Sequence, residues 1–247
     1  MNFFIEAFYL ILYKPLFNAL VFIYYYFPGR DFGVAVILLT LIIRIILYPF
    51  GATAVKSQKV LQELQPKIQE IQKKYKNDKE KQTKAFLELY QKEKVNPFSG
   101  CLPLLVQFPI LIALYRLFWH GFQPEQMIYL YNFMPSPGLI DTFFLKVIDL
   151  SRPNIILAFA AGICQFVQSK MMLPKTSALG QKNNSQIGEI FQKQSVYLFP
   201  VFTVLILWRL PSAIGLYWIV STLFSIFQQY FVFKKGQPKP VEVNNKR

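Results

Sequence analysis

Long apolar runs alternate with short polar segments along this chain of 247 residues. The runs cover residues 32–55, 98–119, 154–173 and 195–233. Pro211-Ser212 divides the last run into spans of about 195–210 and 213–233. Runs of about 20 mainly apolar residues are typical of transmembrane helices. The pattern therefore predicts an all-α integral membrane protein with five transmembrane helices.

The N-terminal region, residues 1–30, has a more mixed pattern. Residues 3–27 are rich in aromatic side chains but include Glu6, Lys14 and Pro15, which interrupt the apolar run. This mixture favours an amphipathic helix that lies in the membrane interface. The alternative is a span whose N-terminus lies in the cytoplasm.

Lysines mark the side of the membrane on which each loop lies. Residues 56–96 hold eleven Lys against six Asp or Glu, so the positive-inside rule places them in the cytoplasm. Apolar residues at helical spacing on both sides of Asn77-Asp78 predict an antiparallel helical hairpin at about 56–93. The loop 174–194 and the basic tail 234–247 are also expected in the cytoplasm. The predicted core, 31–233, therefore leaves the N-terminus outside and the C-terminus inside.

Composition excludes several classes of function. The formal net charge is +14, but the lysines lie in loops and tail, as membrane topology requires, so no nucleic-acid binding is expected. One His, two Cys and spans without acidic residues leave no metal cluster and no protease dyad. No phosphate-binding Gly-x-x-x-x-Gly-Lys-Ser/Thr pattern occurs. We expect neither an enzyme nor a cofactor.

Arg44 is the only charged residue between Asp31 and Lys56. It lies about twelve residues from either end of that run, or about 18 Å at helical rise. This places it near the centre of a hydrocarbon layer about 30 Å thick. A charge at this depth costs at least roughly 2.5–3.5 kcal/mol, so something must hydrate or pair with Arg44.

The spans contain no Asp or Glu that could pair with Arg44. Two interpretations remain open. Carbonyl groups freed by Pro103 or Pro109 could satisfy the guanidinium. Alternatively, a hydrated cavity between the helices receives an anionic ligand, which could be a transported anion, a lipid head group or an acidic polypeptide. The uncharged polar or aromatic residues that could line such a cavity are Thr40, Gln107, Gln165, Gln168, Tyr217 and Trp218.

Four motifs in order resemble the YidC/Oxa1/Alb3 family of membrane protein insertases. They are Leu39-Thr-Leu-Ile-Ile-Arg-Ile-Ile-Leu-Tyr-Pro49, Leu64-Gln-Pro-Lys-Ile-Gln-Glu-Ile-Gln-Lys-Lys-Tyr-Lys76, Val95-Asn-Pro-Phe-Ser-Gly-Cys-Leu-Pro103 with Gln107-Phe-Pro109, and Gly215-Leu-Tyr-Trp218 ahead of Gln228-Gln229. With no large outer domain ahead of the core, the chain is most similar to the compact bacterial form.

The resemblance implies five helices around a hydrophilic groove that is closed to the outside and open to cytoplasm and lipid. Arg44 in this groove would attract acidic residues of the translocated segment, and Thr40, Gln168 and Trp218 match further groove positions. The hairpin would be a mobile element that receives the substrate, and an interfacial helix would precede the core.

The implied function is that of an insertase in the bacterial plasma membrane. Its partners would be nascent membrane proteins and the lipid bilayer. The resemblance also suggests a Sec-type translocon and the ribosome, although the short tail leaves ribosome binding open. The alternative function is a small anion transporter or channel that uses Arg44 as its binding charge. No internal repeat of the kind common in transporters is present.

Overall fold

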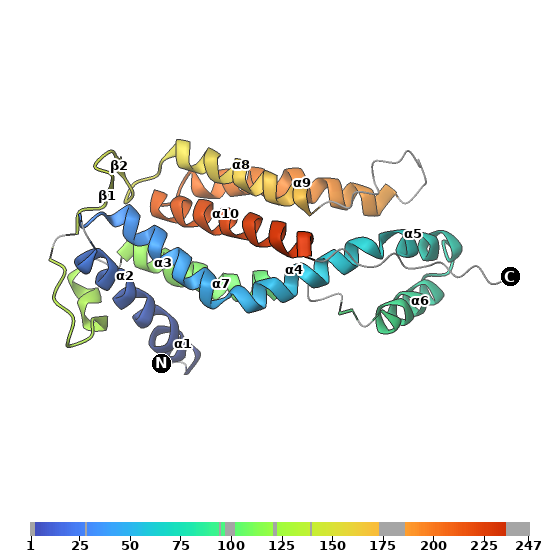
Figure 1. Ribbon diagram of the computed structural model, residues 1–247, viewed down its shortest axis with the longest axis horizontal. Coiled ribbons are helices and arrows are strands. Elements are labelled where there is room, and N and C mark those ends of the chain that lie inside the picture. Colours follow the sequence, from blue (N-terminus) through green and yellow to red (C-terminus); the bar gives the residue numbers. More distant parts are fainter. Residues whose placement is uncertain are drawn as a thin grey trace.

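The computed structural model describes residues 3–27, 29–93, 95–96, 102–120, 123–138, 140–172 and 186–235. Most of the predicted tail 234–247, and residues 174–185 of the predicted cytoplasmic loop, lie outside this part. The described elements are mainly helical (Figure 1). They are α1 (Phe3–Phe8), the π-helix η1 (Tyr9–Tyr13), α2 (Lys14–Tyr26), α3 (Phe32–Ile46), α4 (Tyr48–Glu63), α5 (Gln65–Lys74), α6 (Lys79–Lys92), α7 (Leu102–His120), the 3-10 helix η3 (Pro124–Tyr129), β1 (Phe143–Phe144), β2 (Ile148–Asp149), α8 (Ile155–Met171), α9 (Gln186–Leu207) and α10 (Ser212–Lys235).

The N-terminal elements α1, η1 and α2 form one continuous helical run. It covers 24 residues, Phe3–Tyr26, and is long and apolar enough to cross a membrane. Phe17 and Val21 of this run are fully buried, and α2 packs against α3. Length and composition thus also fit the spanning alternative, and the interfacial position of this helix stays a prediction.

The predicted span 32–55 is divided in the structure. α3 ends at Ile46, and α4 continues beyond residue 55 to Glu63 at an angle of 65° to α3. Pro49 explains the bend, because it has no N–H to donate to the carbonyl of Ile45 and its ring clashes with that carbonyl. The bend brings the first turn of α4 beside α10.

α10 is the central helix of the bundle, since it packs against α3, α4, α7 and α8. It is the second helix that is long and apolar enough to span a membrane by itself. α8 and α9 lie side by side next to it (Figure 1). Shorter apolar helices are found at 105–119, 155–171 and 196–207.

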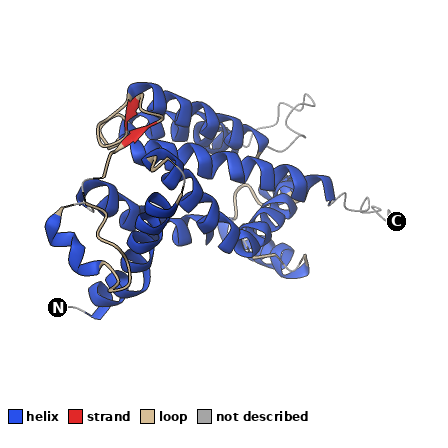
Figure 2. Ribbon diagram, turned by 60° about the vertical axis from the view of Figure 1, so that its left-hand side comes forward, coloured by secondary structure: helices blue, strands red, loops and turns tan. Residues whose placement is uncertain are grey.

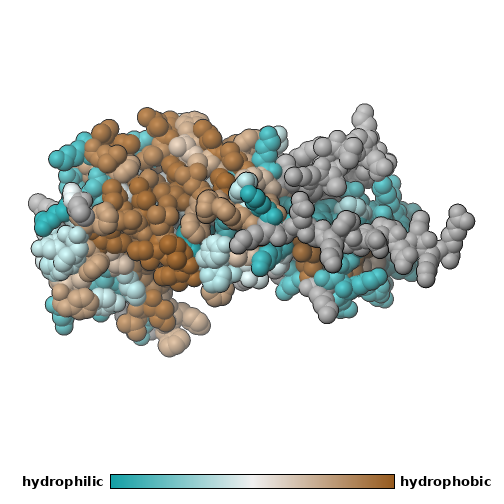
Figure 3. Space-filling view, viewed as in Figure 1, coloured by the Kyte–Doolittle hydropathy of each residue, from teal (hydrophilic) through white to brown (hydrophobic). Residues whose placement is uncertain are grey.

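The outer surface of this bundle is apolar. Ile156 and Phe159 of α8 and Phe199 and Phe202 of α9 are at least half exposed. Figure 3 shows hydrophobic side chains over the bundle and hydrophilic ones around the α5–α6 end. Such a division is typical of a membrane-embedded body with a polar extension.

α5 and α6 pack against each other at the end of α4 and form a helical hairpin. Asp78 begins α6, where its Oδ1 accepts a hydrogen bond from the Lys81 N–H at 3.0 Å. Lys67 and Glu93 form an ion pair of 2.6 Å across the hairpin.

The opposite end of the molecule carries the two-stranded sheet β1–β2 (Figure 2). Backbone hydrogen bonds join this end to the start of α10: Ser212 N donates to Arg152 O and Ala213 N to Leu150 O, both at 3.0 Å. The tight connection between α9 and α10 is therefore fixed by the segment that precedes α8.

Candidate functional site: a recess at Arg44

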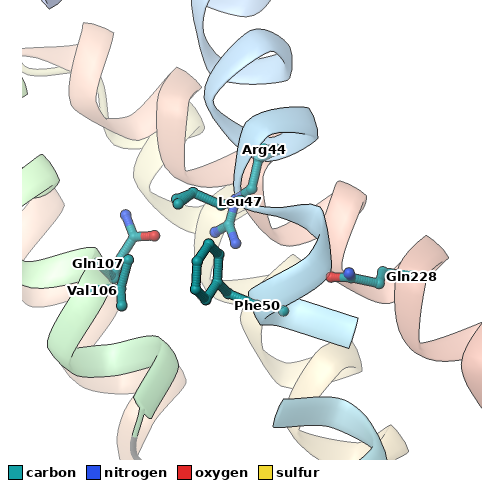
Figure 4. Close-up of a pocket in the computed structure, with 7 residues that line it drawn as sticks. Arg44, Leu47, Phe50, Val106, Gln107 and Gln228 are labelled. Carbon is teal, nitrogen blue, oxygen red and sulfur yellow. The ribbon is translucent and has the colours of Figure 1, made fainter. Parts of the chain in front are cut away.

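A recess lies where the α3–α4 bend, α7 and α10 meet; its empty space, counted together with the solvent at its open side, is about 420 Å³. Its walls combine apolar side chains with two amides and one cation. The lining residues are Arg44, Leu47, Phe50 and Gly51 from the bend, Val106 and Gln107 from α7, and Gln228 from α10 (Figure 4).

Arg44 is half-buried and directs the end of its guanidinium into the recess (Figure 4). Its Nε donates a hydrogen bond of 2.6 Å to the hydroxyl oxygen of Ser221 on α10. Among the described residues, no carboxylate forms an ion pair with Arg44, and no backbone carbonyl accepts a hydrogen bond from it. The interpretation in which freed carbonyls satisfy the charge finds no contact in the described structure.

Amide side chains form two further walls of the recess. Gln107 Nε2 on α7 donates a hydrogen bond to the hydroxyl of Tyr217 on α10. Gln228 Nε2 donates to the Tyr48 carbonyl at 2.9 Å and so joins α10 to the start of α4. Gly51 permits this approach, because a methyl group there would lie 2.8 Å from Gln228 Oε1.

Of Arg44 and the six uncharged residues predicted to line a cavity with it, the structure brings Arg44 and Gln107 together in the lining of this recess. Thr40 is buried one turn before Arg44, and its hydroxyl donates to the Val36 carbonyl at 2.6 Å. It is not among the described residues that line the recess.

Gln165 and Trp218 form a separate polar contact between α8 and α10. Trp218 Nε1 donates to Gln165 Oε1 at 3.1 Å. Gln168 is half-buried on the same helix, α8, three residues after Gln165. Substrate binding by these side chains, as by Arg44, Thr40 and Gln107, stays a prediction.

The sequence prediction did not include Ser221, and it gave Gln228 no place at the site. A signal for both was present, since polar residues recur at steps of four, four and three along α10: Tyr217, Ser221, Ser225 and Gln228. That spacing places them on one face of a helix. The neighbouring Gln229 is 2% exposed, and its Oε1 has no hydrogen-bond partner in the described structure.

The recess suits an acidic group. A guanidinium with free terminal N–H groups binds a carboxylate through two parallel hydrogen bonds. Coulomb attraction is also stronger beside apolar walls such as Leu47 and Phe50 than in bulk water.

Comparison with known proteins agrees with this fold. The model of the 60Kd inner membrane protein family matches residues 22–239. A protein of Fusobacterium nucleatum named membrane protein insertase YidC is 36% identical over 206 residues, which cover 83% of this chain and 88% of the relative. A relative of the same name from Clostridium tetani is 35% identical over 85% of each chain.

Longer relatives share the same core. The protein of that name from Geobacter sulfurreducens is 36% identical over 89% of this chain, but the match covers only 36% of the relative. The helical, apolar fold and these matches define a multi-pass protein of the bacterial plasma membrane. The chain belongs to the YidC/Oxa1 family, the family of the 60Kd inner membrane protein. The comparisons favour insertase function over the anion-transporter alternative.

Proposed function

We propose that this chain is an insertase that receives short polar or acidic segments of nascent membrane proteins in the Arg44 recess and releases them into the bilayer. One observation carries the proposal. The Arg44 guanidinium enters an open recess and has no carboxylate partner among the described residues. The negative charge that would complete this site is supplied by the substrate.

Physical chemistry explains why such a recess helps insertion. A polar tail that crosses hydrocarbon must lose the hydration of its charges and backbone amides. A hydrated recess that reaches part of the way shortens this path. Arg44 gives an acidic tail a temporary counter-charge, and burial of the substrate's apolar segment in lipid then drives release.

Five transmembrane helices form the proposed core, with the N-terminus outside and the C-terminus inside. The α5–α6 hairpin then lies in the cytoplasm and receives the substrate. The apolar segment leaves along α8 and α10, where Trp218 bonds to Gln165 and Gln168 is half-buried on α8. The immediate partners are nascent membrane proteins and lipid, with a Sec-type translocon and the ribosome as further candidates.

Reconstitution tests this function. Proteoliposomes that contain wild type or Arg44→Ala receive a single-span substrate with an acidic translocated tail, and protection of the tail from external protease measures insertion. We expect efficient protection with wild type and a loss of about tenfold or more with Arg44→Ala, since a buried charge interaction is removed. Equal protection with both proteins would refute the role of Arg44.

A further inference from the structure

We propose that Ser221 is a positioning residue that orients Arg44 and thereby makes insertion selective for acidic tails. The inference rests on the proposed function and assigns a role to a residue outside the predicted groove set. Its basis is the 2.6 Å hydrogen bond from Arg44 Nε to Ser221 Oγ.

The position of Ser221 allows it to restrict the rotation of the Arg44 side chain. It is 3% exposed on α10, the central helix, so its own position is fixed by packing. Its backbone carbonyl accepts a hydrogen bond from the Ser225 hydroxyl at 3.0 Å, within the same helix. The Ser221 hydroxyl is therefore a fixed acceptor beside the Nε of the Arg44 guanidinium.

Ser221 bonds to one nitrogen of Arg44, and the identity of that nitrogen determines which N–H groups remain for the substrate. An arginine has one Nε–H and two terminal NH₂ groups in a planar fork. Because Ser221 engages Nε, both terminal groups stay available and point into the recess (Figure 4). That orientation presents the fork edge that a carboxylate binds with two hydrogen bonds.

No other described side chain performs this task. Gln107 donates to Tyr217, and the Thr40 hydroxyl donates to the backbone of its own helix. Without Ser221 the guanidinium would rotate about several bonds, and binding of the substrate would have to order it. Ser221 thus lowers the entropic cost of capturing an acidic group.

A double-mutant cycle separates positioning from packing. The proteins are wild type, Ser221→Ala, Arg44→Lys and the combination, and Ser221→Thr restores the hydroxyl. Ser225→Ala is the matched control, because Ser225 lies one turn further on α10 and its hydroxyl donates to the Ser221 carbonyl, with no other side-chain bond among the described residues. Each protein is reconstituted with two substrates that differ only by Asp→Asn and Glu→Gln changes in the translocated tail.

We expect Ser221→Ala to lower insertion of the acidic substrate about tenfold and to leave the neutral substrate unchanged, since a hydrogen bond to a charged group is lost. Ser221→Thr recovers most of the activity, and Ser225→Ala resembles wild type. In the Arg44→Lys background, Ser221→Ala has no further effect, because lysine has no Nε to orient.

Two results would overturn the inference. An equal loss for acidic and neutral substrates would show that Ser221 acts through packing, as would an undiminished effect in the Arg44→Lys background. An Arg44→Ala control separates this failure from that of the proposed function. If Arg44→Ala abolishes acidic insertion but Ser221→Ala does not, only the role of Ser221 is wrong; if Arg44→Ala has no effect, the proposed function fails as well.

Discussion

Arg44 carries a charge into an apolar helix, and the structure explains how the fold tolerates it. The Arg44 side chain is half-buried, its Nε bonds to Ser221, and its terminal nitrogens open into the recess. A charge in hydrocarbon without such access to water or polar groups would cost several kcal/mol. The bond to Ser221 and the open recess thus explain both how the fold accommodates the Arg44 charge and how that charge could bind a substrate.

Replacement of Arg44 by lysine tests how much of its effect is simple charge. Arg44→Lys should insert an acidic-tailed substrate less well than wild type but much better than Arg44→Ala, since lysine keeps the charge and loses the planar fork. Initial insertion rates in proteoliposomes measure this order. A lysine variant as inactive as the alanine variant would show that the charge alone contributes nothing.

The candidate site could be predicted in part from sequence. Arg44 and Gln107 were found because polar residues in apolar spans are conspicuous and costly. Phe50 and Val106 gave no such signal, because apolar residues in apolar spans are ordinary. Their place at the recess depends on how the bend and α7 meet, which no local pattern encodes.

At the scale of elements, the contact between α8 and α9 is close because Gly162 has no side chain. A methyl group on Gly162 would overlap with the Val204 side chain of α9. We expect Gly162→Ala to destabilise the protein by about 1–3 kcal/mol, the usual range for overpacking in a core. Thermal unfolding in detergent measures the change.

The neighbouring side chain supplies the test of this explanation. Val204→Ala should restore much of the lost stability when it is combined with Gly162→Ala. Ile163→Ala is the control, because Ile163 on α8 is next to Gly162 in sequence but 64% exposed. Additive destabilisation by the first two substitutions would contradict the proposed steric cause.

The segment that joins β2 to α8 depends on the ionised form of Asp149. Burial by itself raises the pKa of this carboxyl, but hydrogen bonds from Ser151 and Thr142 and the charge of Arg152 outweigh it and lower the pKa below its usual value. Because the pKa of Asp149 is lower in the folded state, ionised Asp149 stabilises the fold at pH values above the pKa of the unfolded chain, which is near 4. This stabilisation is lost as the pH falls through the lower pKa of the folded state.

Asp149→Asn tests this pH dependence. The melting temperature of wild type should decrease as pH falls from about 5 toward 3, whereas the variant should lose part of that dependence. Asp141→Asn serves as a control at a nearby exposed acid in the segment before β1. Equal pH dependence in wild type and Asp149→Asn would contradict a stabilising role of the ionised Asp149.

The ends of the helices could be predicted from the sequence at some positions and not at others. The apolar run 154–173 predicted α8 to within two residues at each end, because hydropathy and helix length are local properties. The run 32–55 predicted one straight span, whereas Pro49 divides it at Leu47. Hydropathy gives the length of an apolar segment but not its direction, so the 65° bend could not be inferred.

At the scale of the whole molecule, the α5–α6 hairpin and the β1–β2 sheet lie at opposite ends of the bundle (Figure 1). The proposed topology places the hairpin in the cytoplasm and the sheet outside. Cys101 and Cys164 are first replaced. A single cysteine is then introduced at one end of the molecule by Lys84→Cys on α6, or at the other end by Ser151→Cys beside β2. Both positions are exposed.

Labelling with a membrane-impermeant maleimide measures this orientation. In intact cells stripped of outer barriers we expect labelling at position 151 and none at position 84, and both should react after permeabilisation. The reverse order would show that the positive-inside assignment is wrong for this chain. Labelling at both positions before permeabilisation would indicate leaky cells. Release of a cytoplasmic marker protein measures that leakage.

Arrangement of the spans could not be predicted from the sequence. Each predicted span is visible in the sequence as an apolar run, but only the structure shows that α10 is central and that it meets α3, α4, α7 and α8. Such contacts join segments far apart in the chain, for example Arg44 with Ser221. The recess is a product of these long-range contacts.

The central claim is that an acidic segment of the substrate enters the recess beside Arg44. Site-specific photocrosslinking tests it most directly, with a photoreactive residue at Gln107 in the recess or at Ile206, which is 54% exposed on α9. A stalled nascent chain with an acidic tail should form an adduct through that tail at position 107, and the adduct should diminish with Arg44→Ala or a neutral tail. Adducts of the tail at position 206 alone, or at position 107 regardless of tail charge, would contradict the account.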